Sequence, residues 1–447
     1  MKRVRPCFKY IFLFVLFLLA LSFFGYFNNQ FDPIWNYGYS YAISLGEVPY
    51  RDFTLLTTPL FPFLFSIGLR LISQDNIVFL IEQALLLTAT FYFLFQLFGK
   101  KGWLMLVVMM FPWMNTIVPT YNYFAFFLMV IVMFLEKEKK SDYLIGFILS
   151  LIILTKQSIG LFMLVPTFIL YFKDYKKIIK RMIPVFILCF LFLFYLIITD
   201  SLLPFLDICV FGLFDFANSN GTIFTGFFFI SLLLVAILLW VWKKDKKNIL
   251  VYYSLCAFSF LIPIFTNYHF YIFFLSFMLP IIPLLPLPDT YIKWLSICLS
   301  ITICIINFFL HDVRHTKVLK DVNNFNYYLV AEDSEYSFHQ TVKLYNKYKV
   351  GDKSPIFLGT QSVYFTIVNN ERVDYFDVLN RGNFGYDGTN KMIEKVKKMK
   401  NQVFIINMEK YKEAKGVDQL DTAIIKYVID HSRKIDSWDC YYVYLKE

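Results

Sequence analysis

Long apolar segments, separated by short polar or charged stretches, follow one another from residue 8 to residue 310. Because about 20 apolar residues in a helix cross the hydrocarbon core of a bilayer, the pattern predicts a series of membrane-spanning helices. The predicted spans are 8–27, 77–98, 103–118, 122–135, 143–155, 158–172, 181–199, 223–242, 249–264, 269–287 and 291–310. The pattern then stops, so we expect a membrane module over 1–311 and a second domain over 312–447.

The segment 312–447 has the pattern of an ordinary soluble domain. It alternates predicted strands at 355–359, 402–407 and 440–445 with predicted helices at 389–400 and 417–431. Such alternation indicates a small α/β domain. No Gly-rich phosphate loop, nucleophile elbow or metal-ligand spacing occurs in it. Acceptor binding and a purely structural role are both open for this domain, and the turn-rich stretch 380–385 carries no motif.

One more apolar segment, 56–72, is short and carries Pro59, Pro62 and Arg70. Cytoplasmic loops are enriched in Lys and Arg, so the basic residues decide whether it crosses the membrane. If it does not cross, eighteen Lys and Arg residues lie inside and three outside; if it crosses, six lie inside and fifteen outside. We therefore predict eleven spans, a cytoplasmic N-terminus and an extracytoplasmic C-terminal domain. Residues 28–76 then form one outer loop with an interfacial or re-entrant helix at 56–72.

The first apolar run follows Lys2, Arg3, Arg5 and Lys9. It is longer than the apolar region of a typical signal peptide, and no small-residue cleavage motif stands out. We therefore expect this run to be a retained first helix. Its basic residues are then on the cytoplasmic side, as the charge distribution of the later loops also requires.

The segment 143–172 is predicted to be a hairpin that starts and ends inside, with Thr155-Lys156-Gln157-Ser158 at its apex. Each arm has about 14 residues, which gives about 21 Å of helix at 1.5 Å per residue. The hydrocarbon core is about 30 Å thick, so the apex should lie below the outer surface. A lysine at that depth needs protein or a cavity around it.

Composition agrees with a membrane location, because 58% of the residues are hydrophobic and the mean hydropathy is +0.56. The formal net charge of +10 does not indicate a nucleic-acid partner, since the basic residues lie in short clusters between apolar spans. The seven cysteines form no CxxC pair and no Cys/His spacing that suits zinc. Cys209 and Cys440 are both expected outside, but nothing requires a disulfide. No cofactor is predicted, and no spacing supports a divalent metal.

The outer ends of the predicted spans collect a small set of polar residues. They are Asp32, Glu47, Arg51 and Asp52 in the first loop, Tyr121 and Asn122, Lys156 and Gln157, the turn Asn267-Tyr268-His269, and Glu82 about one turn inside the second span. Polar groups that gather at one face of a membrane module indicate a site at that face.

The first loop contains the run Asp32-x14-Glu47-Val48-Pro49-Tyr50-Arg51-Asp52-Phe53, followed by Thr58-Pro59-Leu60, and a later apex reads Leu154-Thr155-Lys156-Gln157. These motifs resemble the GT-C glycosyltransferases, in particular the bacterial branch related to protein O-mannosyltransferases and lipid A aminoarabinose transferases. The resemblance in layout covers about residues 1–290, and its motifs cover about thirty residues. It implies an all-α polytopic GT-C-like fold that carries the small extracytoplasmic α/β domain.

The resemblance implies transfer of a sugar from a polyprenyl-phosphate donor to an envelope glycan, lipid or protein at the outer membrane face. A carboxylate should take the proton of the acceptor hydroxyl, and cations should stabilise the departing phosphate. Asp32 is the candidate base, with a solvated loop aspartate or a helix cap as the alternative. Lys156 is the candidate phosphate ligand, with snorkelling to the headgroups as the alternative.

Further candidates for the donor phosphate are Arg51 and His269. Arg51 could instead pair with Glu47 or Asp52, and a lone histidine at the end of a span is usually an interfacial residue. Glu82 is costly in a membrane span unless paired, and pairing with Arg70 or Arg51 is the expected solution.

The sequence departs from the family pattern at Asn122, where many relatives carry an acidic residue. An asparagine cannot act as a base and is a poorer metal ligand, which leaves Asp32 as the main acid–base candidate. The outer loop 200–222 could close over the donor lipid, or could be an amphipathic connector. A transporter or flippase of envelope precursors and a non-catalytic assembly protein are the competing functions; the chain shows no matched half-repeats of the transporter kind.

Overall fold

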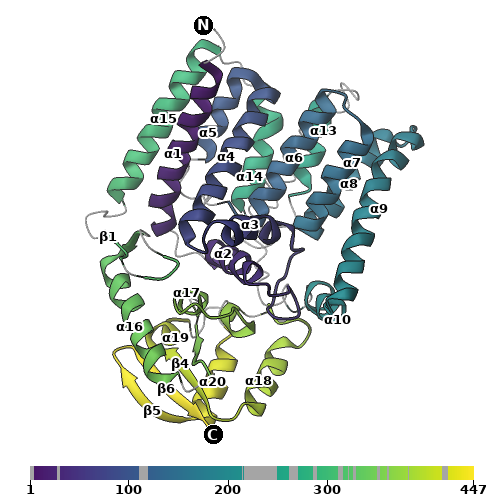
Figure 1. Ribbon diagram of the computed structural model, residues 1–447. Helices are drawn as coiled ribbons and strands as arrows, with labels where there is room; N and C mark the ends of the chain where they lie inside the picture. Colours follow the sequence, from purple (N-terminus) through teal and green to yellow (C-terminus); the bar gives the residue numbers. More distant parts are fainter. Residues whose placement is uncertain are drawn as a thin grey trace.

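The computed structural model describes the backbone of residues 5–27, 31–109, 119–213, 215, 249–260, 270–284, 289–310, 316–320, 322–325, 329–349, 353–359, 362–380, 382–414 and 421–447. Nine helices of at least ten residues in these ranges run side by side in the upper part of Figure 1. They are α1 (Arg5–Phe27), α4 (Asn76–Phe98), α6 (Tyr121–Lys137), α7 (Asp142–Thr155), α8 (Gln157–Tyr171), α9 (Tyr175–Ile198), α13 (Ile249–Phe258), α14 (Phe270–Ile281) and α15 (Asp289–Leu310).

The predicted apolar segments correspond to these helices wherever the structure describes them. The short helix α5 (Trp103–Met109) begins the third predicted span, and the predicted span 223–242 lies outside the described residues. Two described stretches, Asn76–Val107 and Tyr175–Ile198, are long and apolar enough to cross a membrane by length and composition. The number of spans therefore stays a prediction.

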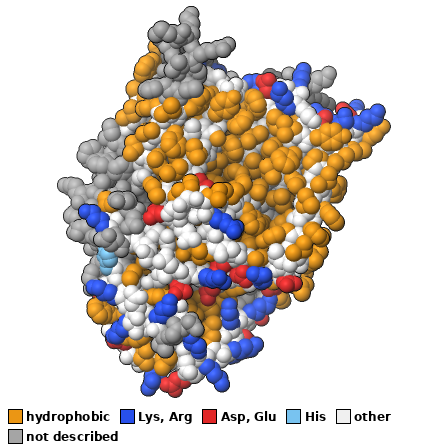
Figure 2. Space-filling view, viewed as in Figure 1, with side chains coloured by type: hydrophobic (Ala, Val, Ile, Leu, Met, Phe, Trp, Pro, Cys, Tyr) orange, Lys and Arg blue, Asp and Glu red, His pale blue; other side chains and the backbone are white. Residues whose placement is uncertain are grey.

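The face of α9 that points away from the other helices is apolar. Phe186 and Phe190 are each 67% exposed on it, and Ile198 is 64% exposed. Figure 2 shows this apolar surface continuing over the upper part of the molecule until a band of charged side chains begins below it. An exposed apolar surface of this extent is typical of a protein whose solvent is lipid.

Two short helices lie crosswise between the bundle and the sheet (Figure 1). They are α2 (Phe31–Ser44) and α3 (Leu60–Leu71), and both belong to the predicted outer loop 28–76. Pro59 stands just before α3, where a proline costs the helix no hydrogen bond. Phe61 and Phe65 bury one face of α3, whereas Leu71 on the other face is 78% exposed. The helix predicted within 56–72 therefore exists and does not run parallel to the bundle.

Buried ion pairs join α6, α7 and α9 at the end of the bundle that carries the basic clusters. The guanidinium of Arg181 is fully buried and contacts Glu136 at 2.6 Å and Asp142 at 2.9 Å. Lys177 contacts Glu136 at 3.4 Å, and Lys137 donates to the carbonyl oxygen of Leu97 at 2.7 Å. The positively charged ends of α4, α6 and α9 are therefore gathered in one place.

The C-terminal part forms a four-stranded sheet at the opposite end of the molecule (Figure 1). Its strands are β3 (Ile356–Leu358), β4 (Gln402–Asn407), β6 (Tyr441–Lys446) and β5 (Arg433–Trp438), in that order, with β3 and β4 parallel and the other pairs antiparallel. Two further strands, β1 (Thr316–Val318) and β2 (Leu329–Ala331), pair separately. The predicted strands at 355–359, 402–407 and 440–445 are confirmed.

Helices cover both faces of the four-stranded sheet. They are α16 (Glu332–Tyr348), α17 (Ser362–Val368), η8 (Tyr375–Val378), α18 (Gly388–Lys398), α19 (Met408–Ala414) and α20 (Thr422–His431). Alternate residues of β4 enter separate cores, Phe404 on one face and Ile405 on the other, as the two-residue period of a strand requires. The predicted helices within 389–400 and 417–431 are confirmed.

The C-terminal part is packed onto the outer loop and the bundle. Phe325 and Val363 belong to the same hydrophobic core as the bundle helices. The amide N–H of Asn76, at the start of α4, donates to the carbonyl oxygen of Asn324 at 2.8 Å. Gly38 of α2 lies so close to Val363 that a Cβ atom there would be 2.5 Å from the valine Cγ2. The sheet therefore sits at the end of the bundle remote from the buried ion pairs.

Candidate functional site

Lys156 occupies the break between α7 and α8. Its backbone is extended, with φ −151° and ψ 103°, between a helix of 14 residues and one of 15 residues. Just beyond the break, a Cβ atom on Gly160 would lie 2.4 Å from the Cα of Ile153, so the two helices cross at close range. The predicted apex at residues 155–158 is confirmed as a helix–break–helix. Its depth in a membrane stays a prediction.

The ammonium group of Lys156 meets the first turn of α6. It donates to Oδ1 of Asn122 at 2.6 Å and lies 5.1 Å from the centre of the Tyr121 ring. Asn122 is fully buried. Lys156 and Asn122, which are 34 residues apart in the sequence, therefore meet in space. A hydrogen bond from an ammonium to a neutral amide orients the lysine while leaving its charge uncompensated by that partner.

Asn36 of α2 brings the first loop to the same place. Its Oδ1 accepts a hydrogen bond of 3.3 Å from the amide N–H of Tyr121. Asp32 stands one turn earlier on α2, in the first turn of the helix. Residues four apart share a helix face, so the backbone places Asp32 on the face of α2 that carries Asn36. The Asp32 side chain lies outside the described residues, as does the whole of His269 with Asn267 and Tyr268.

A second set of hydrogen bonds fastens the motif before α3 to the helix break. The hydroxyl of Thr58 donates to the carbonyl oxygen of Ile153 at 2.6 Å, and its amide donates to Oε1 of Gln157 at 3.2 Å. Gln157 in turn donates through Nε2 to the carbonyl oxygen of Leu56 at 3.1 Å. Gln157 therefore positions the outer loop against the break, and its side-chain amide is used in doing so.

Arg51 and Asp52 pair with each other. The guanidinium lies 2.9 Å from the Asp52 carboxylate, and the Arg51 side chain is 45% exposed. The hydrogen bond from Arg51 lowers the pKa of Asp52, and a bond from the Val48 amide acts in the same direction. Of the two alternatives for Arg51, pairing with Asp52 is therefore confirmed. Contact with a donor phosphate stays a prediction.

Glu47 is buried where the outer loop meets the C-terminal part. Its side chain is 6% exposed, and its Oε2 atom has no hydrogen-bond partner among the described residues. Burial raises the pKa of Glu47 to about 8, and the charges of Asp52 and Asp374 act in the same direction, while Arg372 opposes them. The carboxyl group of Glu47 therefore tends to keep its proton at neutral pH, which is unusual for a glutamate in a loop.

Glu82 contacts α3 and not the expected arginines. Its Oε1 accepts a hydrogen bond of 3.1 Å from the amide N–H of Gly68, and a Cβ atom at Gly68 would lie 2.4 Å from it. Arg51 is paired with Asp52, and Arg70 is exposed with no ion pair to Glu82 among the described residues. The predicted pairing of Glu82 with Arg70 or Arg51 is therefore wrong. The glycine in α3 leaves room for Oε1 of Glu82 to accept from the backbone, whereas the buried Oε2 has no hydrogen-bond partner among the described residues.

Two contributors to this site, Asn36 and Thr58, were not among the predicted site residues. Asn36 could have been found from its spacing of four from Asp32, had the sequence shown that α2 is a helix. Thr58 is part of the Thr58-Pro59-Leu60 motif, but its role depends on a contact with a helix almost one hundred residues later. Neither contact follows from local pattern.

Cys209 and Cys440 do not form a disulfide with each other. The Cys209 side chain is buried and donates to the carbonyl oxygen of Leu55. The loop 200–222 begins with α10 (Leu202–Leu206) and the π-helical turn η3 (Asp207–Phe211), and residues 216–222 lie outside the described residues. No group of three or more potential metal ligands occurs among the residues that the structure describes.

Comparison with known proteins identifies a solved structure with a similar fold. No protein-family model matches the sequence, and no curated protein is similar to it. The crystal structure of ArnT from Cupriavidus metallidurans in the apo state aligns over 98% of both chains, with a TM-score of 0.51 and 10% identity. The structure of that ArnT bound to undecaprenyl phosphate aligns over the same shares with a TM-score of 0.49 and 10% identity. The predicted likeness to the GT-C membrane fold of ArnT is thereby confirmed.

Proposed function

We propose that this protein transfers a sugar from a polyprenyl-phosphate-linked donor to an acceptor of the cell envelope at the outer face of the membrane. The observation that carries the proposal is the position of Lys156. It lies in a helix break, in contact with Asn122, next to a first outer loop that Thr58 and Gln157 fasten to the break. The likeness of the whole chain to the fold of ArnT supports the same class of reaction.

In this reaction a hydroxyl of the acceptor attacks the anomeric carbon, and the lipid phosphate leaves. Lys156 stabilises the charge that develops on the departing phosphate, because an oriented ammonium group in a water-poor site is worth far more than in bulk water. Asp32 takes the proton of the attacking hydroxyl. The position of Asp32 on α2, one turn from Asn36, supports this role, since Asn36 contacts the residue next to Asn122.

The proposed orientation has the N-terminus and the basic clusters in the cytoplasm and the C-terminal part outside. The gathering of the basic ends of α4, α6 and α9 at the end of the bundle remote from the sheet supports it. Single cysteines at the exposed positions Lys100 and Asn390, introduced after removal of the native cysteines, test it in intact cells. An impermeant thiol reagent should label position 390 and spare position 100, and the reverse labelling would contradict the orientation.

The catalytic proposal is tested with the variant Asp32→Asn in membranes supplied with a labelled polyprenyl-phosphate sugar. Transfer should fall by at least about 100-fold, which is the typical contribution of a positioned general base. Asp200→Asn is the matched control. Asp200 is exposed and has φ +54°, a left-handed conformation that asparagine adopts readily, so transfer and expression should be unchanged. Equal transfer by Asp32→Asn and the natural protein would remove Asp32 from the reaction.

A further inference from the structure

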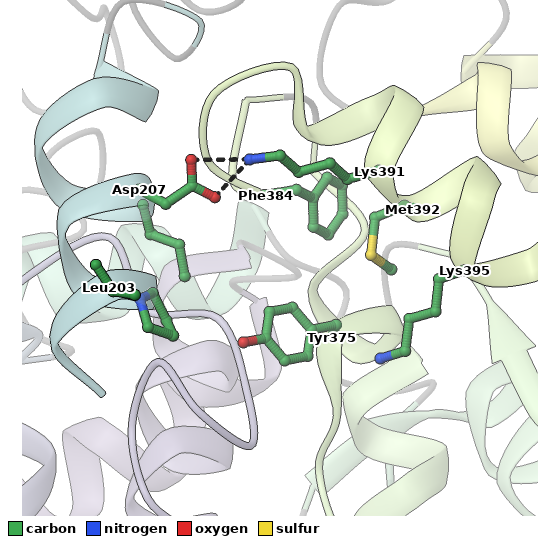
Figure 3. A pocket seen from close by; sticks show the side chains of 9 residues that line it. Leu203, Asp207, Tyr375, Phe384, Lys391, Met392 and Lys395 are labelled. Atoms are coloured by element: carbon green, nitrogen blue, oxygen red, sulfur yellow. Dashed lines mark hydrogen bonds and ion pairs between the residues drawn. The ribbon is translucent and has the colours of Figure 1, made fainter. Parts of the chain in front are cut away.

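A groove with a volume of about 470 Å³ lies between α10–η3 and the C-terminal part (Figure 3). Leu203 and Ile208 form its wall on the side of α10–η3, and Phe384 and Met392 form the opposite wall. Its walls are therefore mainly apolar and come from segments almost two hundred residues apart. Lys156 is not among the residues that line this groove. Tyr375, which lines it, donates to the carbonyl oxygen of Tyr50 in the outer loop.

One carboxylate holds the two walls together. Asp207 accepts two hydrogen bonds from the ammonium group of Lys391, at 2.7 and 2.8 Å, across the upper end of the groove in Figure 3. It also accepts from the amide N–H of Tyr386 at 3.3 Å. Gly385 has φ +85°, and a Cβ atom there would lie 2.5 Å from Oδ2 of Asp207. The carboxylate of Asp207 therefore packs against the turn 382–387, which has no sequence motif.

At the other end of the groove lies Lys395, a second lysine of α18, whose contacts differ from those of Lys391. Lys395 has its ammonium group 4.7 Å from the centre of the Tyr375 ring. It forms no ion pair with any carboxylate that the structure describes, although the buried Asp374 acts on it at longer range. Lys391 is neutralised by Asp207, so Lys395 supplies the cationic charge that the groove offers to a ligand.

The groove also opens next to the apolar surface of the bundle. α10 begins four residues after the end of α9, and its Leu203 is 76% exposed. Phe211 of η3 is 54% exposed. Exposed apolar side chains directly after a membrane-spanning helix belong at the boundary between hydrocarbon and headgroups, where a lipid can enter with its chain against Leu203 and its headgroup toward α18.

We propose that this groove binds a membrane lipid with an anionic phosphate headgroup. Lys395 contacts the phosphate, and Leu203 and Ile208 contact the first carbons of the acyl chain. An apolar slot with one cation at its end matches an amphiphile better than a soluble anion, because the walls contribute only if a chain covers them. Binding there does not require sugar transfer, so the two proposals stand or fall separately.

The test measures binding of a fluorescent phosphatidic acid to the full-length purified protein in detergent micelles, by fluorescence polarisation. Lys395→Ala should weaken binding about tenfold or more, as expected for the loss of a hydrogen bond to a charged group. Lys395→Arg should retain binding. Lys398→Ala is the matched control, since Lys398 is exposed on the same helix and does not line the groove. A second variant, Leu203→Asp, should weaken binding without removing a cation.

Competition identifies the occupant. An unlabelled phosphatidic acid should displace the probe, whereas phosphatidylcholine and inorganic phosphate should displace it poorly. Equal displacement by inorganic phosphate would show a site for free anions and would overturn the proposal. Preferential displacement by polyprenyl phosphate would assign the groove to the donor and would overturn it as a lipid site of its own. Unchanged binding by Lys395→Ala would overturn it as well.

Discussion

The two ends of the helical bundle each hold a cationic side chain, and the partners of the two cations differ. At the end with the basic clusters, the guanidinium of Arg181 lies between the carboxylates of Glu136 and Asp142. At the end that faces the sheet, the ammonium of Lys156 donates to the neutral amide of Asn122. Arg181 and Asn122 are both fully buried. The two contacts differ in charge: Arg181 pairs with two carboxylates, whereas the contact between Lys156 and Asn122 is one with a neutral amide.

This difference matches the roles that we propose for the two residues, structural for Arg181 and functional for Lys156. A buried cation with two carboxylates has its charge balanced within the protein and holds three helices together. A neutral amide orients an ammonium group without cancelling its charge, which suits the phosphate contact that we propose for Lys156. Glu47, at the same end as Lys156, has an Oε2 atom with no partner among the described residues, so the end that faces the sheet also contains a group that is incompletely satisfied. Incompletely satisfied buried groups are expected at sites that bind ligands.

The largest effect on stability should come from the paired end. Arg181→Met leaves Glu136, which is 7% exposed in its side chain, without its closest cation. Loss of one partner of a buried ion pair costs about 3–5 kcal/mol, so thermal unfolding in detergent should begin at a clearly lower temperature. Lys180→Met at the neighbouring exposed position should unfold like the natural protein. Similar unfolding temperatures for the two variants would show that the ion pairs do not hold α6, α7 and α9 together.

Lys156→Met should reduce sugar transfer more than stability, in contrast to Arg181→Met. Transfer from a labelled polyprenyl-phosphate sugar should fall by about 100-fold, which corresponds to about 2.7 kcal/mol of lost stabilisation of the departing phosphate. The unfolding temperature should change less than in Arg181→Met, because Lys156 is only half-buried whereas Arg181 is fully buried between two carboxylates. Lys140→Met, which removes an exposed lysine at the basic end, should leave transfer unchanged. A variant of Lys156 that is unstable but fully active would reverse the comparison.

Glu47 should make stability depend on pH in an unusual direction. Its pKa is raised to about 8 in the folded protein from an ordinary value of 4.5, so the folded state holds the proton more tightly than the unfolded chain. The resulting stabilisation is complete below about pH 4.5 and is lost as the pH rises to about 8. Glu47→Gln removes this dependence. The variant should gain in unfolding temperature relative to the natural protein between pH 6 and pH 9, and an unchanged difference would contradict the raised pKa.

The smallest effect is expected for Arg51→Ala. The pair with Asp52 is exposed, and such pairs contribute about 0–1 kcal/mol, so the unfolding temperature should hardly move. The Michaelis constant for the donor is the informative measurement. A rise with unchanged stability would assign Arg51 to the donor phosphate, whereas unchanged kinetics would leave it as the partner of Asp52.

Secondary structure and the general plan were accessible from the sequence because they depend on local patterns. The apolar segments predicted the helices of the bundle, and alternation predicted β3, β4 and β6. The count of basic residues predicted that the helix within 56–72 does not cross the membrane, and its place relative to a membrane stays a prediction. The helix α2 was not anticipated, since its sequence mixes aromatic and polar residues without a clear amphipathic period.

The contacts of polar side chains were much less accessible. Lys156 was singled out from its place at a predicted apex, but its partner follows from how α6 and α7 pack. Glu82 was assigned to an arginine on charge alone, but in the structure its Oε1 accepts from the amide of Gly68 instead. The role of the turn 382–387 depends on Asp207, which lies far from it in the sequence.

The sequence by itself determined which segments are apolar enough to be helices, where these apolar segments give way to strands, and which charged residues would be costly to bury. These depend on hydrophobic periodicity and charge, which are properties of neighbouring residues. Only the tertiary structure decided that Arg181 is paired with carboxylates while Lys156 is held by an amide, and that Asp207 closes a groove against the C-terminal part. The physical reason is that a hydrogen bond requires two groups within about 3 Å, and a sequence does not specify which distant side chains come that close.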